Sequence, residues 1–294
     1  MTIDTNLNRK DKLLSNYISK YKNVPMFSLV EINILGLCNR KCKFCPRYNE
    51  ELYGNKDEYM DVKLYEKLME DLKGINFNGT ILFSGFSEPL LHPELEELIY
   101  LTKKYNPNTH LEIITNGDFA TEHKIKSLMD KGLDTLLISL YDGEFQVKHF
   151  NDIKSKLKLK EDNIKLRKRY YTVEENFGII LSNRAGMISI DNTNVSPLKK
   201  PLKRSCYYPF YQVMIDYNGD VICCPHDWRK QVIVGSIENS HIFEIWNGDS
   251  LDKIRRSLYK KDRNIIPCKE CDVKGVLIGS ENFENWVKYY EGNK

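Results

Sequence analysis

The sequence of 294 residues lacks any run of 18 consecutive apolar residues, the length that a membrane span requires. It also lacks a secretion signal, because the first residues, MTIDTNLNRKDKLL, contain neither an apolar stretch nor a small-residue cleavage site. Neither charge sign is in clear excess: 44 basic and 41 acidic residues give a net charge of +3, which indicates no nucleic-acid partner. We therefore expect a cytoplasmic protein without nucleic-acid or membrane partners.

Cysteine, in contrast, is present in an informative number and pattern. Eight cysteines in a reducing compartment favour a metal site, an iron–sulfur cluster or radical chemistry over a disulfide framework. They form two groups along the chain. The front group is Cys38, Cys42 and Cys45, and the back group is Cys206, Cys223, Cys224, Cys268 and Cys271.

Short apolar runs alternate with amphipathic stretches in the first two thirds of the chain. The expected strands are residues 27–34, 80–83, 111–115, 135–140 and 178–182, and the expected helices are residues 61–73, 122–131 and a segment opened by Pro93. This order predicts a parallel sheet with right-handed crossovers, either open or curled into a barrel. The basic stretch 154–169 predicts a solvated helix face and connector.

Composition divides the chain into three parts. Residues 1–24 predict a short N-terminal helix, and residues 25–195 form the α/β unit. The segment DNTNVSPLKKPLK, rich in Asn, Ser and Pro, is typical of a linker. Residues 196–294 then predict a small α+β domain. Its expected elements are a hairpin of residues 212–216 and 221–224 turned at Asn218–Gly219, and helices around 241–259 and 281–290.

The front cysteines form a CxxxCxxC loop directly after an expected strand. Three thiolates can hold three irons of a [4Fe–4S] cluster and leave the fourth iron open to another ligand, whereas a closed zinc site needs a fourth protein ligand that this loop lacks. With Phe44 just before Cys45, the segment resembles the radical S-adenosylmethionine (SAM) superfamily. The resemblance implies a partial (β/α)6 barrel in which SAM chelates the open iron and is cleaved to a 5′-deoxyadenosyl radical.

Further motifs similar to those of this family stand where later strands end. The segment SGFSEP is similar to the family's GxGEP, with Ser87 in place of a glycine, and Asn116 lies in a match to its TNG motif. Parallel folds build their sites at this edge of the sheet. The resemblance implies SAM contacts for Phe44, Gly85, Ser87, Glu88, Asn116, Ser139 and Arg184. For Arg184, contact with the substrate or a structural role are the alternatives.

The back cysteines resemble an auxiliary cluster site. Gly219 and Cys224 have the Gly-x4-Cys spacing of the SPASM/Twitch domain, and the segment HIFEIWN resembles one of its helices. No cysteine follows Cys271, so the similarity is to the shorter Twitch form with one fully ligated [4Fe–4S] cluster. The implied ligands are Cys206, Cys224, Cys268 and Cys271, although the last pair alone also suits a structural zinc ribbon. The implied cofactors are SAM and two [4Fe–4S] clusters.

One cysteine, Cys223, is left without a cluster. Successive strand side chains point to opposite faces, so Cys223 and Cys224 are expected to face apart, with Cys224 as the ligand by the spacing rule. A free thiol at this place resembles the radical SAM peptide epimerases. That resemblance implies L-to-D inversion in a ribosomally synthesised precursor peptide, with Cys223 returning a hydrogen atom to Cα and a flavodoxin- or ferredoxin-type protein as reductant.

Two other functions are consistent with parts of the sequence. Aminocyclitol dehydrogenases share the four-cysteine Twitch layout, and in such an enzyme the auxiliary cluster accepts an electron from a sugar or cyclitol alcohol while Cys223 is dispensable. A non-enzymatic electron-transfer or zinc scaffold leaves the SAM-type motifs unexplained. The sequence therefore predicts an epimerase first and a dehydrogenase second.

Overall fold

The computed structural model describes residues 6–292 and contains a sheet of eight strands in the order β10-β9-β8-β3-β4-β5-β6-β7. Strands β8 and β3 to β7 run parallel, and β9 and β10 extend the sheet as antiparallel strands. The strands are β3 (Leu29–Ile32), β4 (Thr80–Phe83), β5 (His110–Thr115), β6 (Thr135–Leu140), β7 (Ile164–Lys168), β8 (Gln212–Ile215), β9 (Asp220–Ile222) and β10 (Ile233–Ser236). A separate ribbon is formed by β1 (Lys20–Tyr21) and β2 (Val24–Pro25).

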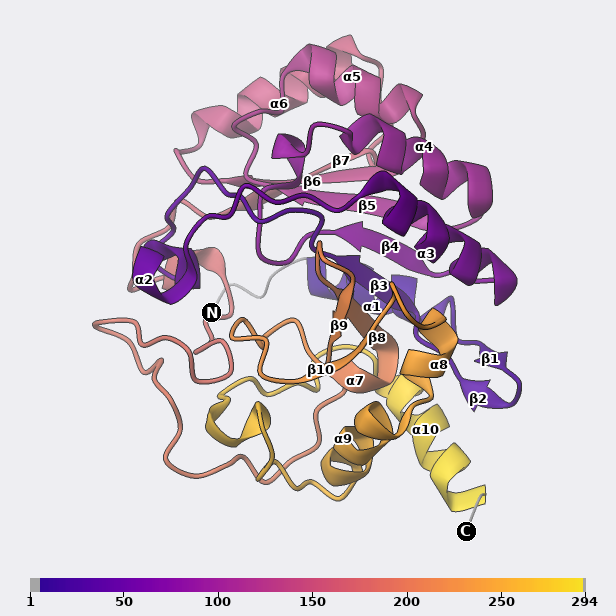
Figure 1. Cartoon of the computed structure of the whole chain (residues 1–294). Helices are drawn as coiled ribbons and strands as arrows, with labels where there is room; N and C mark the ends of the chain where they lie inside the picture. Colours follow the sequence, from indigo (N-terminus) through magenta and orange to yellow (C-terminus); the bar gives the residue numbers. More distant parts are fainter. Residues whose placement is uncertain (1–5, 293–294) are drawn as a thin grey trace.

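Helices α3 to α6 connect the parallel strands and lie along one side of the sheet (Figure 1). Parallel neighbours need crossovers of this kind. The helices are α1 (Asn6–Ser15), α2 (Glu50–Tyr53), α3 (Val62–Gly74), α4 (Leu95–Tyr105), α5 (Glu122–Asp130), α6 (Phe145–Lys156), α7 (Tyr208–Tyr211), α8 (Ile242–Trp246), α9 (Asp249–Tyr259) and α10 (Ser280–Gly292). The expected α/β class, with a parallel-sheet core and a smaller C-terminal α+β part, is confirmed.

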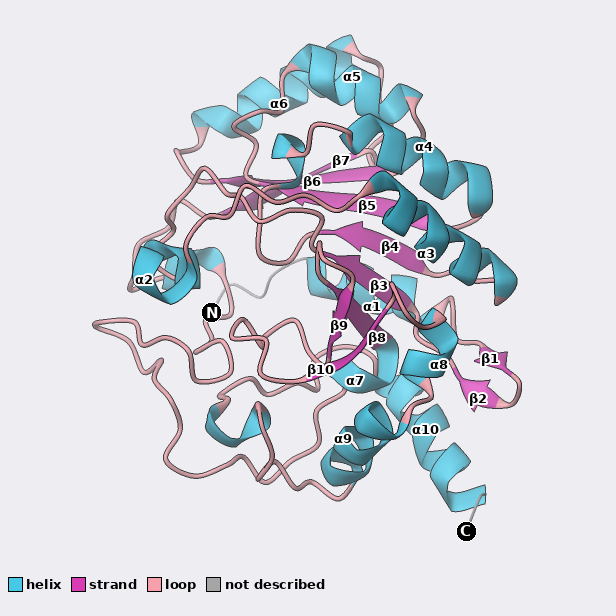
Figure 2. Cartoon of the chain, viewed as in Figure 1, coloured by secondary structure: helices cyan, strands magenta, loops and turns pink. Residues whose placement is uncertain are grey.

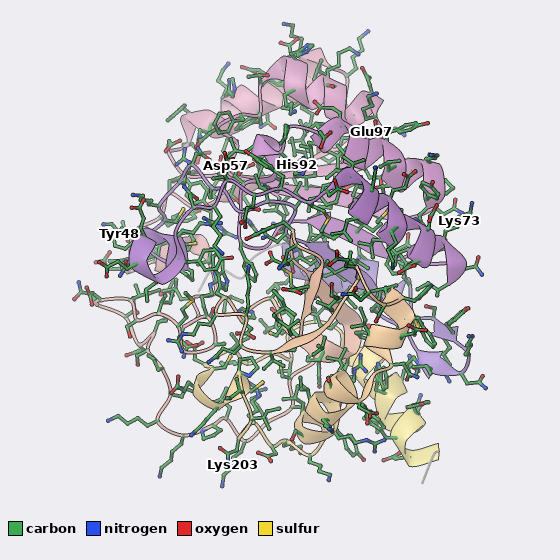
Figure 3. All side chains as sticks on the ribbon, viewed as in Figure 1. Tyr48, Asp57, Lys73, His92, Glu97 and Lys203 are labelled. Atoms are coloured by element: carbon green, nitrogen blue, oxygen red, sulfur yellow. The ribbon has the colours of Figure 1, made fainter. Side chains whose placement is uncertain are left out.

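Local sequence explains where the helices begin and which side they bury. Asp61 caps α3 by accepting hydrogen bonds from two backbone N–H groups of its first turn, at 2.8 and 3.1 Å, and Thr121 caps α5. Charged residues lie on the outer side: Figure 3 shows Lys73 on α3 and Glu97 on α4 pointing away from the sheet, and both are exposed. Strands β4 and β6 are buried along their whole length, as expected for a sheet covered on both faces.

The C-terminal part continues the sheet of the N-terminal part. β8 pairs in parallel with β3, from Leu29 opposite Gln212 to Ile32 opposite Ile215. The expected hairpin is confirmed, because β8 and β9 are antiparallel and their turn contains Gly219, whose φ of 86° favours a residue without a Cβ atom. The pairing of β3 with β8 thus fixes the hairpin that leads to the back cysteines relative to the strand that leads into the front loop.

Two expectations for the sheet are wrong. The strand at 178–182 does not form: residues 179–207 contain neither helix nor strand, as the long loop in Figure 2 shows. The preceding Asn176, Phe177 and Gly178 have left-handed backbone with φ of 54°, 52° and 66°, which interrupts an extended run. The last strand of the parallel series is instead β7, inside the basic stretch 154–169 that we expect from the sequence to be a helix face and connector.

β7 combines pairing to the sheet with a charged outer side. It pairs with β6 from Ile164 to Lys168, and Ile164 is buried. Lys165 and Lys168 form ion pairs with Asp162 at 2.8 Å and Glu144 at 2.7 Å. Charged side chains are usual on an edge strand because they discourage pairing with another chain. The alternation of basic and apolar residues here therefore belongs to an edge strand, and only the end of α6 within this stretch is helical.

The N-terminal helix is shorter than the sequence predicts and one C-terminal helix is divided, whereas α10 contains the whole of the helix expected at 281–290. α1 covers residues 6–15 of the helix expected at 1–24, and the ribbon β1–β2 follows it, whereas residues 1–5 lie outside the described part. The helix expected at 241–259 is divided at Asn247–Gly248 into α8 and α9. Between residues 6 and 292, no helix combines the length and the apolar character that crossing a membrane requires.

A shared apolar core joins the C-terminal helices to the beginning of the sheet. Trp246 is fully buried, and its ring centre lies 5.2 Å from that of Phe27 and 5.9 Å from that of Trp286. Its Nε1–H donates to the carbonyl of Pro25 at 2.8 Å. One cluster of buried residues contains all three rings together with residues of α3 to α5. The two parts of the chain are therefore expected to unfold together.

We predict that Trp246→Ala lowers the free energy of unfolding by about 3–5 kcal/mol, because a large buried ring is replaced by a cavity. Thermal unfolding followed by circular dichroism should show one transition that shifts as a whole. The control Phe145→Ala removes a ring that is 68% exposed and should change the transition little. Two separate transitions, of which only one responds to Trp246→Ala, would contradict a shared core.

Candidate active site and cluster-binding loops

The front cysteine loop follows β3 and is shaped through its backbone. The N–H group of Cys45 donates to the carbonyl of Cys42 at 2.9 Å, which closes a tight turn. The side chain of Asn55 makes two hydrogen bonds to the backbone of Cys38, accepting from its N–H at 2.9 Å and donating to its carbonyl at 3.1 Å. The structure thus brings the three front cysteines into one compact loop at the end of a central strand.

Arg47, which the sequence analysis does not single out, joins this loop to its neighbour. It is 4% exposed, and its guanidinium donates to the carbonyl of Gly36 at 2.9 Å, to Oδ1 of Asn55 at 2.7 Å and to the carbonyl of Phe86. Phe86 lies in the loop after β4, so one side chain connects two strand-end loops. Cysteine spacing gives no signal for such a residue; its place two residues after Cys45 is the only hint.

The three front thiols share one environment. Removal from water raises the pKa of Cys38 to about 11, and removal from water together with the nearby Cys45 raises the pKa of Cys42 to about 12. Thiols of this kind stay neutral at pH 7 unless positive charge compensates them. The residues therefore fit an iron–sulfur cluster, whose irons would bind the sulfurs as thiolates.

The loop after β4 contains the expected Gly85 and Ser87. Gly85 has a φ of 101°, and a Cβ atom there would lie 2.7 Å from the methyl group of Met214, so the close approach needs a glycine. Ser87 stands where the family motif has a glycine, and its hydroxyl donates to Oδ1 of Asn33 at 2.7 Å. This substitution therefore anchors the loop to the end of β3.

Glu88 is 2% exposed and connects two loops. Its carboxylate accepts hydrogen bonds from the hydroxyl of Thr115 at 2.6 Å and from the backbone N–H groups of Asn116 at 2.7 Å and Leu90 at 3.0 Å. Burial raises the pKa of Glu88 to about 7 despite these bonds. These bonds orient the loops after β4 and β5, and since a carboxylate accepts about four hydrogen bonds, Oε2 can accept one more. The SAM contact expected for Glu88 stays a prediction.

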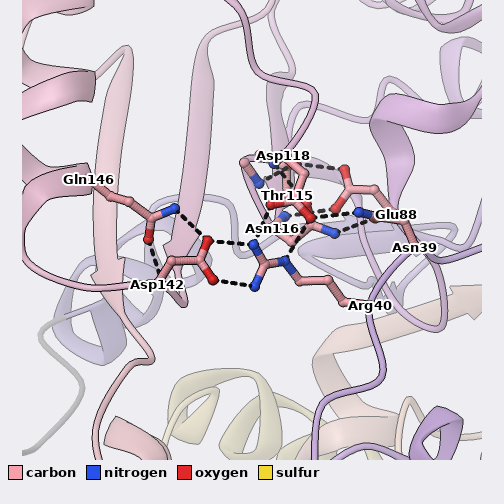
Figure 4. Close-up of polar contacts among 9 residues, drawn as sticks. Asn39, Arg40, Glu88, Thr115, Asn116, Asp118, Asp142 and Gln146 are labelled. Atoms are coloured by element: carbon pink, nitrogen blue, oxygen red, sulfur yellow. Dashed lines mark hydrogen bonds and ion pairs between the residues drawn. The ribbon is translucent and has the colours of Figure 1, made fainter.

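The middle of the front loop is fixed to the loops after β5 and β6, as Figure 4 shows. Arg40 forms ion pairs with Asp118 and Asp142. Asn39 donates to Asp118 at 2.6 Å, and the side chain of Asn116 donates to Asn39 at 2.7 Å. Asn116, an expected SAM contact, is thus part of the network that sets the position of the cluster loop.

A cavity of about 360 Å³ borders this network, within the size range of small-molecule pockets. Its lining includes Phe44, whose ring centre lies 6.4 Å from that of Tyr141 and 5.3 Å from that of Phe177. Aromatic walls suit a purine ring, so we expect the adenosyl part of SAM here. Ser139, the expected contact on β6, is 2% exposed and its hydroxyl accepts from Arg167 at 2.9 Å.

The four expected ligands of the back group lie together. Burial raises the pKa of Cys206, Cys224, Cys268 and Cys271, and repulsion by Cys206 adds to this rise for the other three. The sulfur of Cys206 packs directly against Gly275, because a Cβ atom there would lie 2.2 Å from it. Within residues 6–292, no three His, Cys, Asp or Glu side chains converge on a position for a single metal ion. Four thiols that act on one another's pKa suit the wider spacing of a fully ligated cluster.

Cys223 and Cys224 differ in their surroundings. The sulfur of Cys224 accepts a hydrogen bond from the backbone N–H of His226 at 3.4 Å. Cys223 is 4% exposed and belongs to the main apolar core, and its N–H donates to the carbonyl of Val232 at 3.1 Å. Burial, and then the charge of Asp227, raises the pKa of Cys223. Both thiols nevertheless lie near the other back cysteines, because Cys206 adds to the rise in the pKa of Cys223 as well as of Cys224, and Cys206 belongs to the same apolar core as Cys223. The assignment of Cys224 as the ligand therefore stays a prediction from its spacing to Gly219.

Arg184 lies in a left-handed turn that is tied to the back cysteine loop. Arg184 and the two residues after it have φ of 49°, 54° and 83°. Asn183 holds this turn: its side chain accepts from the N–H of Gly186 at 2.9 Å and donates to the carbonyl of Glu270 at 2.7 Å, and its own N–H donates to Asp272 at 2.9 Å. A conformation this costly persists only where its surroundings fix it.

The charge of Arg184 acts on Cys45 of the front group and on His226, two residues after Cys224. It opposes the rise that burial causes in the pKa of Cys45, and burial together with Arg184 lowers the pKa of His226 to about 3. The Nε atom of Arg184 is buried and has no hydrogen-bond partner among residues 6–292. An unpaired buried donor is costly, so this N–H is a candidate for a further hydrogen bond, and the SAM contact expected for Arg184 stays a prediction.

Two family models match this chain, and each match contains one of the two cysteine groups. Residues 32–177 match the radical SAM superfamily, and residues 206–272 match SPASM, an iron–sulfur cluster-binding domain. The chain is similar to the S-adenosyl-L-methionine-dependent 2-deoxy-scyllo-inosamine dehydrogenase of Niallia circulans. The two are 30% identical over 264 residues, which cover 89% of this chain and 98% of that enzyme.

Solved structures resemble the fold. The crystal structure of BtrN in complex with AdoMet and 2-DOIA has a TM-score of 0.71 at 28% identity, covering 87% of this chain and 96% of that chain. Native anSMEcpe with bound AdoMet and Cp18Cys peptide has a TM-score of 0.56 at 14% identity, covering 92% of this chain and 98% of that chain. The second likeness shows the fold alone.

These comparisons confirm the cofactors and correct the function. SAM and [4Fe–4S] clusters are the cofactors, one cluster catalytic and one auxiliary, which decides against the zinc alternatives. The prediction of an epimerase with a precursor peptide as substrate is wrong, because the relative that is covered almost completely is a dehydrogenase of a small molecule. An external reductant is still required, as for radical SAM enzymes generally. The chain belongs to the radical SAM superfamily and carries a C-terminal iron–sulfur domain of the SPASM type.

Proposed function

We propose that the protein is a dehydrogenase that oxidises a secondary alcohol of an aminocyclitol, or of a related sugar-like molecule, to a ketone. The observation that supports this proposal is the 30% identity to an aminocyclitol dehydrogenase across 98% of its length. A likeness of that extent runs through both parts of the chain. The gathered back thiols and the single leftover cysteine are consistent with it.

Oxidation of such an alcohol removes one hydrogen atom, one proton and one electron from the carbinol group. When bound, SAM and the two clusters supply a 5′-deoxyadenosyl radical as the hydrogen-atom acceptor and an acceptor for the electron. The chain itself has to hold the alcohol oxygen and ease the loss of its proton, because an alcohol is a weak acid. No hydrogen atom returns to the carbon, so a thiol such as Cys223 has no step to perform.

We assign Arg184 to the alcohol oxygen. Its Nε–H group is buried and unpaired within the described part of the chain, and its charge acts on Cys45 of the front group and on His226 next to the back group. A guanidinium in this place would stabilise negative charge that develops on the oxygen as the proton leaves. The turn held by Asn183 keeps the side chain in position.

The proposal predicts a ketone product two mass units lighter than its substrate. Enzyme reconstituted without oxygen would be incubated with SAM, dithionite and 2-deoxy-scyllo-inosamine, with other cyclitols and amino sugars tested in parallel by mass spectrometry. Deuterium at the carbinol carbon should appear in 5′-deoxyadenosine, with one 5′-deoxyadenosine formed for each ketone. A product of unchanged composition that takes up solvent deuterium would contradict the proposal.

Arg184→Ala should lower kcat/KM by about 10- to 150-fold, because a hydrogen bond to a charged group contributes about 1.5–3 kcal/mol. Arg184→Lys keeps the charge without the fork and should lose less. The matched control is Arg229→Ala, since Arg229 donates to the carbonyl of Gly186 in the same turn at 3.1 Å but is partly exposed. Full activity of Arg184→Ala, at unchanged iron content, would remove Arg184 from the reaction.

Cys223→Ala and Cys224→Ala should give opposite results. We expect Cys223→Ala to keep its iron content and its rate of ketone formation, because Cys223 packs in the core and has no chemical step. Cys224→Ala should lose the auxiliary cluster, and with it half of the bound iron, as measured by iron analysis and electron paramagnetic resonance. Loss of the cluster in Cys223→Ala instead would reverse the assignment of the two cysteines.

A further inference from the structure

Arg263 is a buried cation held by backbone carbonyl groups. It is 2% exposed. Its guanidinium donates hydrogen bonds to the carbonyl oxygens of Arg204 at 3.0 Å, Ser205 at 2.9 Å, Val273 at 2.6 Å and Lys274 at 2.7 Å. Across residues 6–292 it forms no ion pair with Asp or Glu. Its charge is therefore fixed in place without being neutralised.

The carbonyl groups place this charge beside the sulfurs of the back group. Two of them come just before Cys206, and the other two come just after Cys271 and before Gly275. A Cβ atom on Gly275 would lie 2.2 Å from the sulfur of Cys206 and 3.1 Å from Nη2 of Arg263. The sulfur and the guanidinium thus border the same small space.

The charge of Arg263 reaches three of the four expected ligands of the auxiliary cluster. It lowers the pKa of Cys206, Cys268 and Cys271, against the larger and opposite effect of burial. A positive charge that favours thiolates also favours any further negative charge on the same sulfurs. Arg263 therefore adds positive charge to a region from which burial has removed water.

Three other charged residues, Arg204, Asp227 and Asp272, also act on these thiols. Arg204 lowers the pKa of Cys206, whereas Asp227 raises the pKa of Cys268 and Asp272 that of Cys271. Arg263 differs from these groups in its geometry, because its guanidinium binds carbonyls on both sides of the back group and lies 3.1 Å from the position that a Cβ atom on Gly275 would take beside Cys206. Arg263 is therefore the charge whose removal we test.

We propose that Arg263 raises the reduction potential of the auxiliary cluster. Four thiolates give the ligated cluster a net negative charge, and uptake of one electron increases it by one unit. A fixed positive charge nearby stabilises the reduced state more than the oxidised state, and strongly so where water is excluded. Carbonyl oxygens hold the guanidinium without cancelling its charge, as carboxylates would.

An auxiliary cluster that is easily reduced suits an enzyme whose substrate gives up an electron. The role of Arg263 in catalysis therefore rests on the proposed dehydrogenase function. The test of the reduction potential itself requires no substrate. A wrong assignment of the substrate would leave the measured potential unaffected, and an unchanged potential would leave the product analysis standing. The two failures can therefore be told apart.

The test is a redox titration of the reconstituted holoenzyme followed by electron paramagnetic resonance. Addition of SAM alters the signal of the front cluster and so separates it from that of the auxiliary cluster. For Arg263→Gln we expect the ratio of reduced to oxidised auxiliary cluster at a fixed potential to fall at least tenfold, which is a shift of about 59 mV for a one-electron couple. An unchanged midpoint at full iron content would overturn the proposal.

Two variants separate charge from structure. Arg263→Lys keeps the charge but not the four-carbonyl fork, so its midpoint should stay near that of the wild type, and equal shifts in the Lys and Gln variants would contradict the electrostatic role. Arg255→Gln is the matched control, because Arg255 is fully buried and donates to the carbonyls of Pro209 at 2.7 Å and Trp246 at 2.8 Å. Its guanidinium lies against the rings of Trp246 and Trp286, 3.8 and 4.1 Å from their centres, so the midpoint should not move.

If Arg263→Gln does not retain its iron, Asp272→Asn provides the second measurement. Asp272 raises the pKa of Cys271, so loss of its negative charge should shift the midpoint upward, in the direction opposite to that expected for Arg263→Gln. A midpoint that does not move in Asp272→Asn would show that fixed charges around these sulfurs do not set the potential, and the proposal would be wrong.

Discussion

Parallel pairing of β3 with β8 is the constraint on which the rest of the structure depends. It makes one sheet from two stretches of chain, and where these strands end the side chain of Asn33 donates to Asp216, 183 residues further on, at 2.7 Å. The same Asn33 side chain accepts from the N–H of Phe86 at 3.0 Å and so positions the loop after β4. A register shift of one residue would turn every side chain of β8 to the other face. The front loop and the hairpin of the back cysteines could then not both be placed.

Both cysteine groups are accompanied by a buried arginine that closes loops through carbonyl groups. Arg47 connects the loops after β3 and β4 beside the front thiols, and Arg263 connects the two segments that flank the back thiols. Thiols removed from water resist ionisation, as the pKa of about 11 for both Cys38 and Cys271 shows, yet iron binds thiolates. An arginine held by neutral oxygens brings positive charge into such a region and leaves its field available to the sulfurs. At each site, one side chain thus contributes both to the shape of the loops and to the positive charge near the sulfurs.

Cysteine spacing and apolar runs made much of this architecture predictable. β4 and β6 have the expected bounds because they are buried along their whole length, and the motifs at strand ends meet because Glu88 accepts hydrogen bonds from the loop after β5. β7 is missed by sequence reasoning because its pairing with β6 is a long-range property that its basic residues conceal. Arg263 leaves no motif, since its partners are backbone carbonyls far apart in the chain. The sequence around Cys223 does not reveal whether its thiol faces a substrate or the core. The epimerase function, which depended on a thiol facing the substrate, could therefore not be predicted from it.

The loop of residues 179–207 has no regular structure, yet Asn183 near its beginning is held by several hydrogen bonds. Asn183 is fully buried and donates to the carbonyls of Ser196 at 2.8 Å and Glu270 at 2.7 Å, next to Cys271. Any movement of the back cysteine loop would therefore move the turn that presents Arg184. In the proposed reaction, hydrogen bonds of Asn183 join the turn that presents Arg184 to the two residues that flank Cys271. If Cys271 binds the auxiliary cluster, that cluster would therefore also help to fix the position of the group assigned to the alcohol oxygen.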